Sequence, residues 1–191
     1  MSKNRLEAFS DGVIAILITI MVLELKIPPG ADLDALRSIL PSFLLYVLSF
    51  VFLGIYWNNH HHMLHVTSRI NGRILWGNLH LLFWLSLVPA TTNWMGEHRL
   101  EALPTAVYGI VLLMAAIAYW ILQRLIIAHE GPQSKLARAV GHDVKGNISP
   151  ALYMAAIGLA FVSPWMADGI YVFVALIWLV PDRRIESMLH E

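Results

Sequence analysis

The chain has 191 residues, of which 58% are hydrophobic and 14% charged, and its mean hydropathy is +0.63. Soluble domains carry about 25% charged residues, so this composition excludes a soluble globular enzyme. The absence of cysteine excludes disulfide frameworks, iron–sulfur clusters and thiolate metal sites, and a formal net charge of zero argues against a nucleic-acid partner.

Apolar runs of about twenty residues are long enough to cross the ~30 Å hydrocarbon core of a bilayer, and they predict an all-α membrane protein. We expect one transmembrane domain that covers residues 1–191. Its six predicted helices lie near residues 9–27, 37–61, 74–95, 103–127, 148–166 and 168–181.

The first run is short, because its uninterrupted core extends only from Gly12 to Leu23. We therefore expect an inner helix that depends on its neighbours. A secretory signal peptide is the alternative, but charged residues frame the run and no small-residue cleavage pattern follows it. The last two runs are separated by Ala167 alone, which predicts a tight hairpin through Ser163-Pro164 and Asp168-Gly169.

The basic residues predict the orientation, because Lys and Arg accumulate in the cytoplasmic loops of membrane proteins. With a cytoplasmic N-terminus, the outer loops hold three basic residues: Lys26, Arg37 and Arg99. The inner segments then hold ten: Lys3, Arg5, Arg69, Arg73, Arg124, Lys135, Arg138, Lys145, Arg183 and Arg184. An even number of spans places both termini in the cytoplasm, together with the longest loop, near residues 128–147.

Polar residues within a membrane span are candidates for functional groups, because burying a charge in lipid is costly. One such group lies at the start of the first span and consists of Arg5, Phe9, Ser10 and Asp11. Arg5 and Phe9 share a helix face, whereas Asp11 lies on another, so Arg5 and Asp11 are expected to contact different neighbours. A helix start whose acid suits the positive end of the helix dipole is the alternative.

A histidine cluster ends the second span, where His60, His61, His62 and His65 follow Trp57 and Asn58. His61 and His65 are one turn apart and could bind a transition metal, but acidic ligands are missing nearby. A hydrogen-bonded structural cluster and a pH sensor are the other interpretations.

The remaining patterns favour packing over chemistry. No phosphate-binding glycine loop, nucleophile elbow or carboxylate pair is visible. Five polar residues of the third span are expected to form hydrogen bonds between helices: Asn78, His80, Thr91, Thr92 and Asn93. A stripe on the first span, of a kind that ordinary helix packing also produces, consists of Ile16, Thr19, Ile20 and Leu23.

The segment Arg5-x-x-x-Phe9-Ser10-Asp11-Gly12 at the mouth of the first of six spans resembles the signature of the transmembrane protein 175 family of potassium channels. The similarity extends over about the first hundred residues and includes Leu23 to Pro28, Trp57-x-x-His60-His61, Leu75-Trp76-x-Asn78 and Leu87-Val88-Pro89. A single six-span repeat is similar to the prokaryotic members of the family.

The resemblance implies a homotetrameric cation channel without the P-loop filter of ordinary potassium channels, in the plasma membrane of a prokaryote. The first helix of each subunit would line the pore. Ile16 would form the innermost constriction, Thr19 or Ile20 the middle ring, and Leu23 the outer ring, with Thr19 favoured. Potassium would be the permeant ion and no cofactor would be needed.

The resemblance also assigns roles to the polar groups. Arg5, Phe9, Ser10 and Asp11 would brace the pore helix rather than touch the ion. Their partners would be Trp57, His60, His61 and Asn78. A metal-dependent membrane enzyme built on the histidines, and a proton-coupled transporter built on Asp11 and the histidines, are the alternatives.

Overall fold

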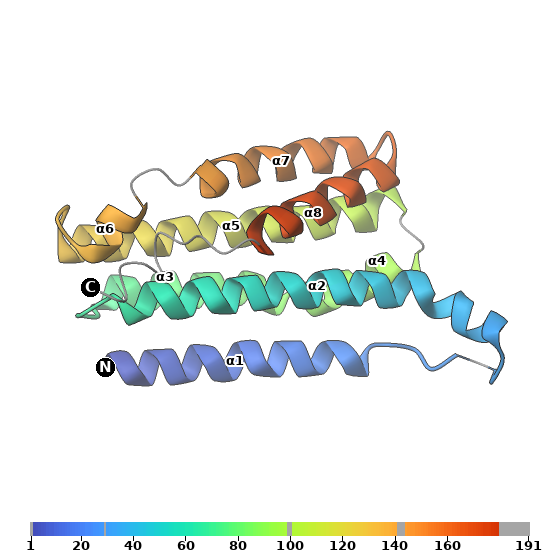
Figure 1. Ribbon diagram of the computed structural model, residues 1–191, viewed down its shortest axis with the longest axis horizontal. Helices are drawn as coiled ribbons and strands as arrows, with labels where there is room; N and C mark the ends of the chain where they lie inside the picture. The colour runs from blue at the N-terminus through green and yellow to red at the C-terminus, as the bar shows by residue number, and fades with distance from the viewer. Residues whose placement is uncertain (1, 29, 99–100, 141–143, 180–191) are drawn as a thin grey trace.

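The computed structural model describes residues 2–28, 30–98, 101–140 and 144–179, and every regular element in these ranges is an α-helix. Figure 1 shows the long helices running side by side. The elements are α1 (Lys3–Leu23), α2 (Leu33–His65), α3 (Gly72–Ser86), α4 (Val88–Glu97), α5 (Ala102–Glu130), α6 (Lys135–Val140), α7 (Val144–Ala160) and α8 (Pro164–Leu179).

Several helices are suited to a membrane by length and composition. Four helical segments are long and apolar enough to cross one: Lys3–Leu23, Leu33–His65, Gly72–Glu97 and Ala102–Glu130. α8 is a shorter apolar helix of 16 residues. The all-helical prediction is therefore confirmed for the described part of the chain, while the number of crossings stays a prediction.

The first and third predicted helices differ in detail from the observed ones. α1 begins at Lys3 and ends at Leu23, whereas the prediction ended it at residue 27. The third predicted helix is divided into α3 and α4 by a turn at Leu87. Pro89 lies in the first turn of α4, and because proline has no amide hydrogen it cannot complete the ladder that would make α3 and α4 continuous.

The C-terminal hairpin was placed too late by the sequence prediction. α7 ends at Ala160 and α8 begins at Pro164, so Asp168 and Gly169 lie inside a helix rather than in the turn. Proline is favoured at the first position of a helix, where its missing hydrogen-bond donor costs nothing. The predicted loop near residues 128–147 contains the short helix α6, and residues 180–181 of the sixth predicted span lie outside the described residues.

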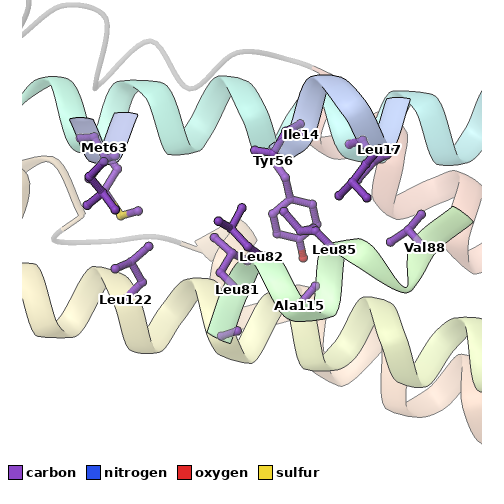
Figure 2. Close-up of a cluster of buried hydrophobic side chains, with 14 of the residues drawn as sticks. Ile14, Leu17, Tyr56, Met63, Leu81, Leu82, Leu85, Val88, Ala115 and Leu122 are labelled. Carbon is purple, nitrogen blue, oxygen red and sulfur yellow. The ribbon is translucent and has the colours of Figure 1, made fainter. Parts of the chain in front are cut away.

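Two clusters of buried side chains hold the bundle together. Figure 2 shows part of the first, to which α1 contributes Ile14 and Leu17 and α2 contributes Tyr56 and Met63, together with side chains of α3 and α5. In this view Met63 lies well away from Ile14 and Leu17, further along the bundle. The second cluster joins α2 and α5 to α7 and α8, and Tyr171 is at its centre with no exposed surface. α2 and α5 therefore connect an N-terminal core to a C-terminal core.

α1 is not an inner helix of the subunit, contrary to the sequence prediction. It lies along one edge of the bundle (Figure 1) and contacts α2, α3 and α4. Its buried residues form a single stripe: Leu6, Ser10, Ile14, Leu17 and Met21. The rest of its circumference is left without a packed helix from the described part of the chain.

The basic residues gather at one end of the bundle. The start of α1, the end of α2, the start of α3 and the end of α5 all lie there (Figure 1), and the ammonium of Lys3 donates to the carbonyl of His65 at 2.8 Å. The elements and loops at this end carry seven described basic residues: Lys3, Arg5, Arg69, Arg73, Arg124, Lys135 and Arg138. The opposite end carries Lys26 and Arg37 among the described residues, so the charge asymmetry expected from the sequence is present in three dimensions.

Candidate pore helix and its polar anchors

The open face of α1 carries the residues that sequence reasoning assigned to a pore. Leu23 is 81% exposed, Ile16 57% and Ile20 40%, and Thr19 is also exposed. These are apolar or neutral side chains in the middle and last turns of a helix that is apolar enough to cross a membrane. An apolar face without a partner on this helix points to contact with other subunits, with lipid or with a conduction path.

The helix geometry separates Thr19 from Ile20. Successive residues of an α-helix are about 100° apart, so the direction opposite the centre of the buried stripe can be located from the sequence numbers. Thr19 lies close to that direction, whereas Ile20 is about 100° away from it. Ile16 and Leu23 lie within about 60° of it, on the same side of the helix.

The hydroxyl of Thr19 donates a hydrogen bond within its own helix. Its Oγ1 donates to the carbonyl oxygen of Ile16 at 2.8 Å. A hydroxyl that donates to its own helix keeps its oxygen lone pairs available as acceptors. On the open face, Thr19 therefore presents an oxygen acceptor between two aliphatic residues.

A buried chain of hydrogen bonds connects α1 to α3 and α2. The amide of Asn78 donates from Nδ2 to Ser10 Oγ at 2.9 Å, and Asn78 Oδ1 is 2.7 Å from His60 Nε2. Since an amide oxygen can only accept, the proton of this bond belongs to His60 Nε2. Ser10 in turn donates to the carbonyl of Leu6 at 2.9 Å, and all three side chains are almost completely buried.

A second contact ties α1 to α2 one residue further along. The indole nitrogen of Trp57 donates to Asp11 Oδ1 at 3.0 Å. Arg5 and Phe9 are not part of either contact, because both side chains are exposed on the open side of α1. The structure thus joins Ser10 and Asp11 to Trp57, His60 and Asn78, and it separates Arg5 and Phe9 from them.

The histidine cluster divides into an inward and an outward part. His60 is buried and bonded to Asn78, whereas His61 stacks between Trp57 and His65, with ring centroids 6.0 Å and 6.1 Å away. Among the described residues no group of three or more His, Cys, Asp or Glu side chains is arranged to hold a metal ion. The cluster is therefore divided between helix packing and a solvent-facing ring stack.

At the opposite end, α1 is tied to α4 by contacts that sequence reasoning missed. Lys26 forms an ion pair with Glu97 at 2.8 Å, and the amide of Asn93 donates to Glu24 at 3.3 Å. These four residues line a cavity of 210 Å³ between α1, α2 and α4. The opposite charges of Lys26 and Glu97 are a visible signal, but the two residues are 71 positions apart and no periodicity relates them.

The polar residues of the third predicted helix have mixed outcomes. The interhelical hydrogen bonds expected for Asn78, Thr92 and Asn93 are confirmed, and Thr92 pairs with Ser49 of α2 at 2.7 Å. The expectation is wrong for two residues. His80 accepts from Trp84 of its own helix at 3.0 Å, and Thr91 donates to the carbonyls of Leu87 and Val88.

Comparison with known proteins relates this geometry to one family. The family model described as endosomal/lysosomal potassium channel TMEM175 matches residues 5–89. A potassium channel of Chryseobacterium is 55% identical over 191 residues, which are the whole of both chains. A potassium channel of Streptomyces collinus is 34% identical over 84% of each chain.

A solved structure also matches. It is the crystal structure of a lysosomal potassium-selective channel TMEM175 homolog from Chamaesiphon minutus, with a TM-score of 0.81 and 29% sequence identity. The match covers 93% of this chain and 96% of that one. The human relative, named an endosomal/lysosomal proton channel, is 36% identical over 96 residues, which are 44% of this chain and 19% of the relative.

Proposed function

The chain belongs to the TMEM175 family of channels, and from that premise we propose that it is a potassium-permeable cation channel whose pore is lined by the open face of α1. The family and its curated relatives are channels and not enzymes, so the interpretation of the histidine cluster as a metal-dependent enzyme is set aside. Membership of this channel family carries the proposal, and the face of α1 that its own subunit leaves uncovered supports the placement of the pore there.

In the proposed assembly, four subunits place their α1 helices around a central axis. The six membrane crossings of each subunit are predicted from the apolar runs of the sequence, and the tetramer comes from the family resemblance. The edge position of α1 supports an assembly in which this helix meets its copies (Figure 1). Ile16 and Leu23 then form aliphatic rings, and Thr19 rather than Ile20 forms the ring between them. A threonine oxygen can accept a partly dehydrated cation, whereas the aliphatic rings limit flow by excluding water.

The buried hydrogen bonds support a fixed pore helix. Ser10 and Asp11 hold the inner end of α1 against α2 and α3. At the outer end, the ion pair of Lys26 with Glu97 and the bond from Asn93 to Glu24 hold the segment after α1 against α4. Since the two ends are anchored on the side away from the open face, the pore-facing residues keep a defined direction. Neither anchor touches the proposed ion path.

The basic end of the bundle is proposed to face the cytoplasm of a prokaryotic cell. Seven described basic residues belong to elements and loops at that end and two to the other end (Figure 1), and this bias sets the orientation of multi-pass membrane proteins. Both termini are then cytoplasmic. A cysteine placed at residue 2 should be labelled by an impermeant maleimide only in opened cells, because the natural chain has no cysteine of its own.

Flux into liposomes tests the function. Purified protein should pass potassium faster than sodium down a gradient, without an energy source, and a pH-sensitive dye should report proton movement in the same vesicles. Ile16→Ser and Leu23→Ser should raise the flux or weaken the preference for potassium. The buried Ser49 of α2 offers a control, because Ser49→Ala changes a residue far from α1's open face.

Three results would contradict this function. Potassium flux no greater than in empty vesicles would exclude a channel, and uptake that saturates and requires a pH gradient would favour the proton-coupled transporter. Unchanged permeation in both Ile16→Ser and Leu23→Ser would show that α1 does not line the path. Counting subunits by native mass spectrometry would test the tetramer separately.

A further inference from the structure

We propose that a groove between α3 and α5, at the basic end of the bundle, binds an anionic phospholipid. The groove has a volume of 770 Å³ and is lined by residues that include Arg73, Trp76, Gly77, His80, Ile121 and Leu125. It lies outside the proposed pore, because none of these residues is on α1. The inference uses the membrane location of the chain and does not depend on which residues line the pore.

Among the residues that the structure describes, Arg73 has no acidic partner. Three described acidic residues of α1 and α5 have other partners: Glu7 pairs with Lys3, Asp11 accepts from Trp57 and Glu130 accepts from the hydroxyl of Ser68. No ion pair within the described ranges includes Arg73. Its guanidinium, which suits phosphate geometry, is therefore not engaged by any described acidic residue and can serve a ligand.

His80 supplies a second donor to the same groove. The indole of Trp84 can only donate, and it donates to His80 Nε2 at 3.0 Å. The proton of a neutral His80 ring therefore resides on Nδ1, which is left as a hydrogen-bond donor. His80 is seven residues beyond Arg73 on α3, which is about 10 Å deeper along the helix. A donor at that depth suits the acyl ester of a lipid whose phosphate is bound by Arg73.

The floor and rim of the groove suit an acyl chain. A Cβ on Gly77 would lie 2.8 Å from Leu125 Cδ1, so the glycine lets α3 and α5 approach closely and leaves an apolar floor of Leu125 and Ile121. Trp76 stands at the rim with 75% of its surface exposed. Tryptophan is enriched at the level of lipid headgroups, where its ring is half in the apolar region and half in the polar one.

These features together select an anionic lipid rather than a protein segment or a neutral lipid. A phosphate-binding arginine and a deeper polar donor follow one another along α3, and α5 supplies the apolar floor beside them, so the groove offers a contact for each part of a phospholipid. Basic pockets between membrane helices on the cytoplasmic side are a recurrent setting for anionic headgroups. A zwitterionic lipid brings a positive group into a region that is already positive.

Lipid binding to the delipidated full-length protein tests this site. Native mass spectrometry should show tighter binding of phosphatidylglycerol than of phosphatidylcholine with the same acyl chains. Arg73→Gln should weaken the phosphatidylglycerol complex about five-fold and leave phosphatidylcholine unchanged. Arg124→Gln is the matched control, because it removes the same charge at the same end, from a residue that stacks on Trp120 with 5.4 Å between guanidinium carbon and ring centroid.

Several outcomes would overturn the proposal. An equal loss in Arg124→Gln would show general attraction to the basic end, and inorganic phosphate that displaces the lipid at equal concentration would show an anion site without lipid specificity. Trp76→Cys should be labelled by maleimide more slowly in vesicles containing phosphatidylglycerol than in pure phosphatidylcholine. Complete protection in both kinds of vesicle would identify the groove as an interface between copies of the chain.

Discussion

The two faces of α1 differ sharply in how far their side chains are buried. One face buries Ile14 completely and carries Ser10 and Asp11, which bond to neighbouring helices. The other face leaves Ile16 and Leu23 exposed over most of their surface. The same helix therefore contributes stability on one side and is available for permeation on the other, and substitutions on the two sides should separate these effects.

The largest loss of stability is expected from breaking the buried hydrogen-bond chain. Asn78→Leu removes the bond to Ser10, whose hydroxyl keeps its bond to the Leu6 carbonyl, and leaves the buried Nε2 proton of His60 without an acceptor. An unsatisfied buried group of this kind costs about 1–3 kcal/mol. We expect the free energy of unfolding in detergent micelles to fall by about 3 kcal/mol. Asn58→Leu, on the exposed side of α2, should change it little.

A double-mutant cycle sharpens that prediction. Ser10→Ala combined with Asn78→Leu should cost less than the sum of the single changes, since both remove the same bond. Additive losses would mean that the bond between Ser10 and Asn78 contributes nothing to the stability of the subunit.

The next largest effect is the direct comparison of the two faces. Ile14→Ala removes packed atoms from the core and should lower the free energy of unfolding by about 2 kcal/mol. Ile16→Ala makes the same chemical change two residues later, on the open face, and should cost less than about 0.5 kcal/mol. Chemical denaturation in mixed micelles measures both. Equal losses would contradict the division of α1 into a buried and an open face.

A smaller effect is expected at the contact between Asp11 and Trp57. Trp57→Phe keeps an aromatic ring beside His61 but removes the indole donor, so we expect a loss of about 1 kcal/mol. Asp11→Asn keeps an acceptor oxygen and should lose less. If Asp11→Asn were the more damaging change, the negative charge rather than the hydrogen bond would be what holds this end of the helix.

The smallest effect is expected at the ion pair of Lys26 and Glu97. Both side chains are exposed to water, where such pairs gain little and are screened by salt. Lys26→Gln should lower the melting temperature slightly at low ionic strength and not at high ionic strength. A large loss that persists in high salt would show that the outer end of α1 is held as firmly as the inner end.

The sequence predicted much of the fold because membrane helices can be recognised from the length and hydropathy of their apolar runs. It predicted wrong boundaries where a proline decided them, at the break before Pro89 and at the start of α8. It also predicted an inner position for α1, because a short apolar run between charged residues is typical of a helix that is surrounded by other helices. In the described subunit those neighbours cover one side only.

The sequence also predicted only part of the candidate site. The motif Arg5 to Asp11 and the polar residues Trp57, His60 and Asn78 could be identified as a group by resemblance. Which of them touch could not, because a hydrogen bond between helices depends on the rotation of each helix about its axis. Ser10 and Asn78 meet, whereas Arg5 and Phe9 turn away.

The sequence by itself determined that this protein is a helical membrane protein, which of its ends is basic and which family it resembles. These properties depend on composition and on order along the chain. The tertiary structure decided that α1 lies at the edge, that His60 points inward while His61 points outward, and that Thr19 rather than Ile20 lies opposite the buried stripe. Such choices depend on how helices distant in the sequence pack and rotate against one another, and no local pattern contains that information.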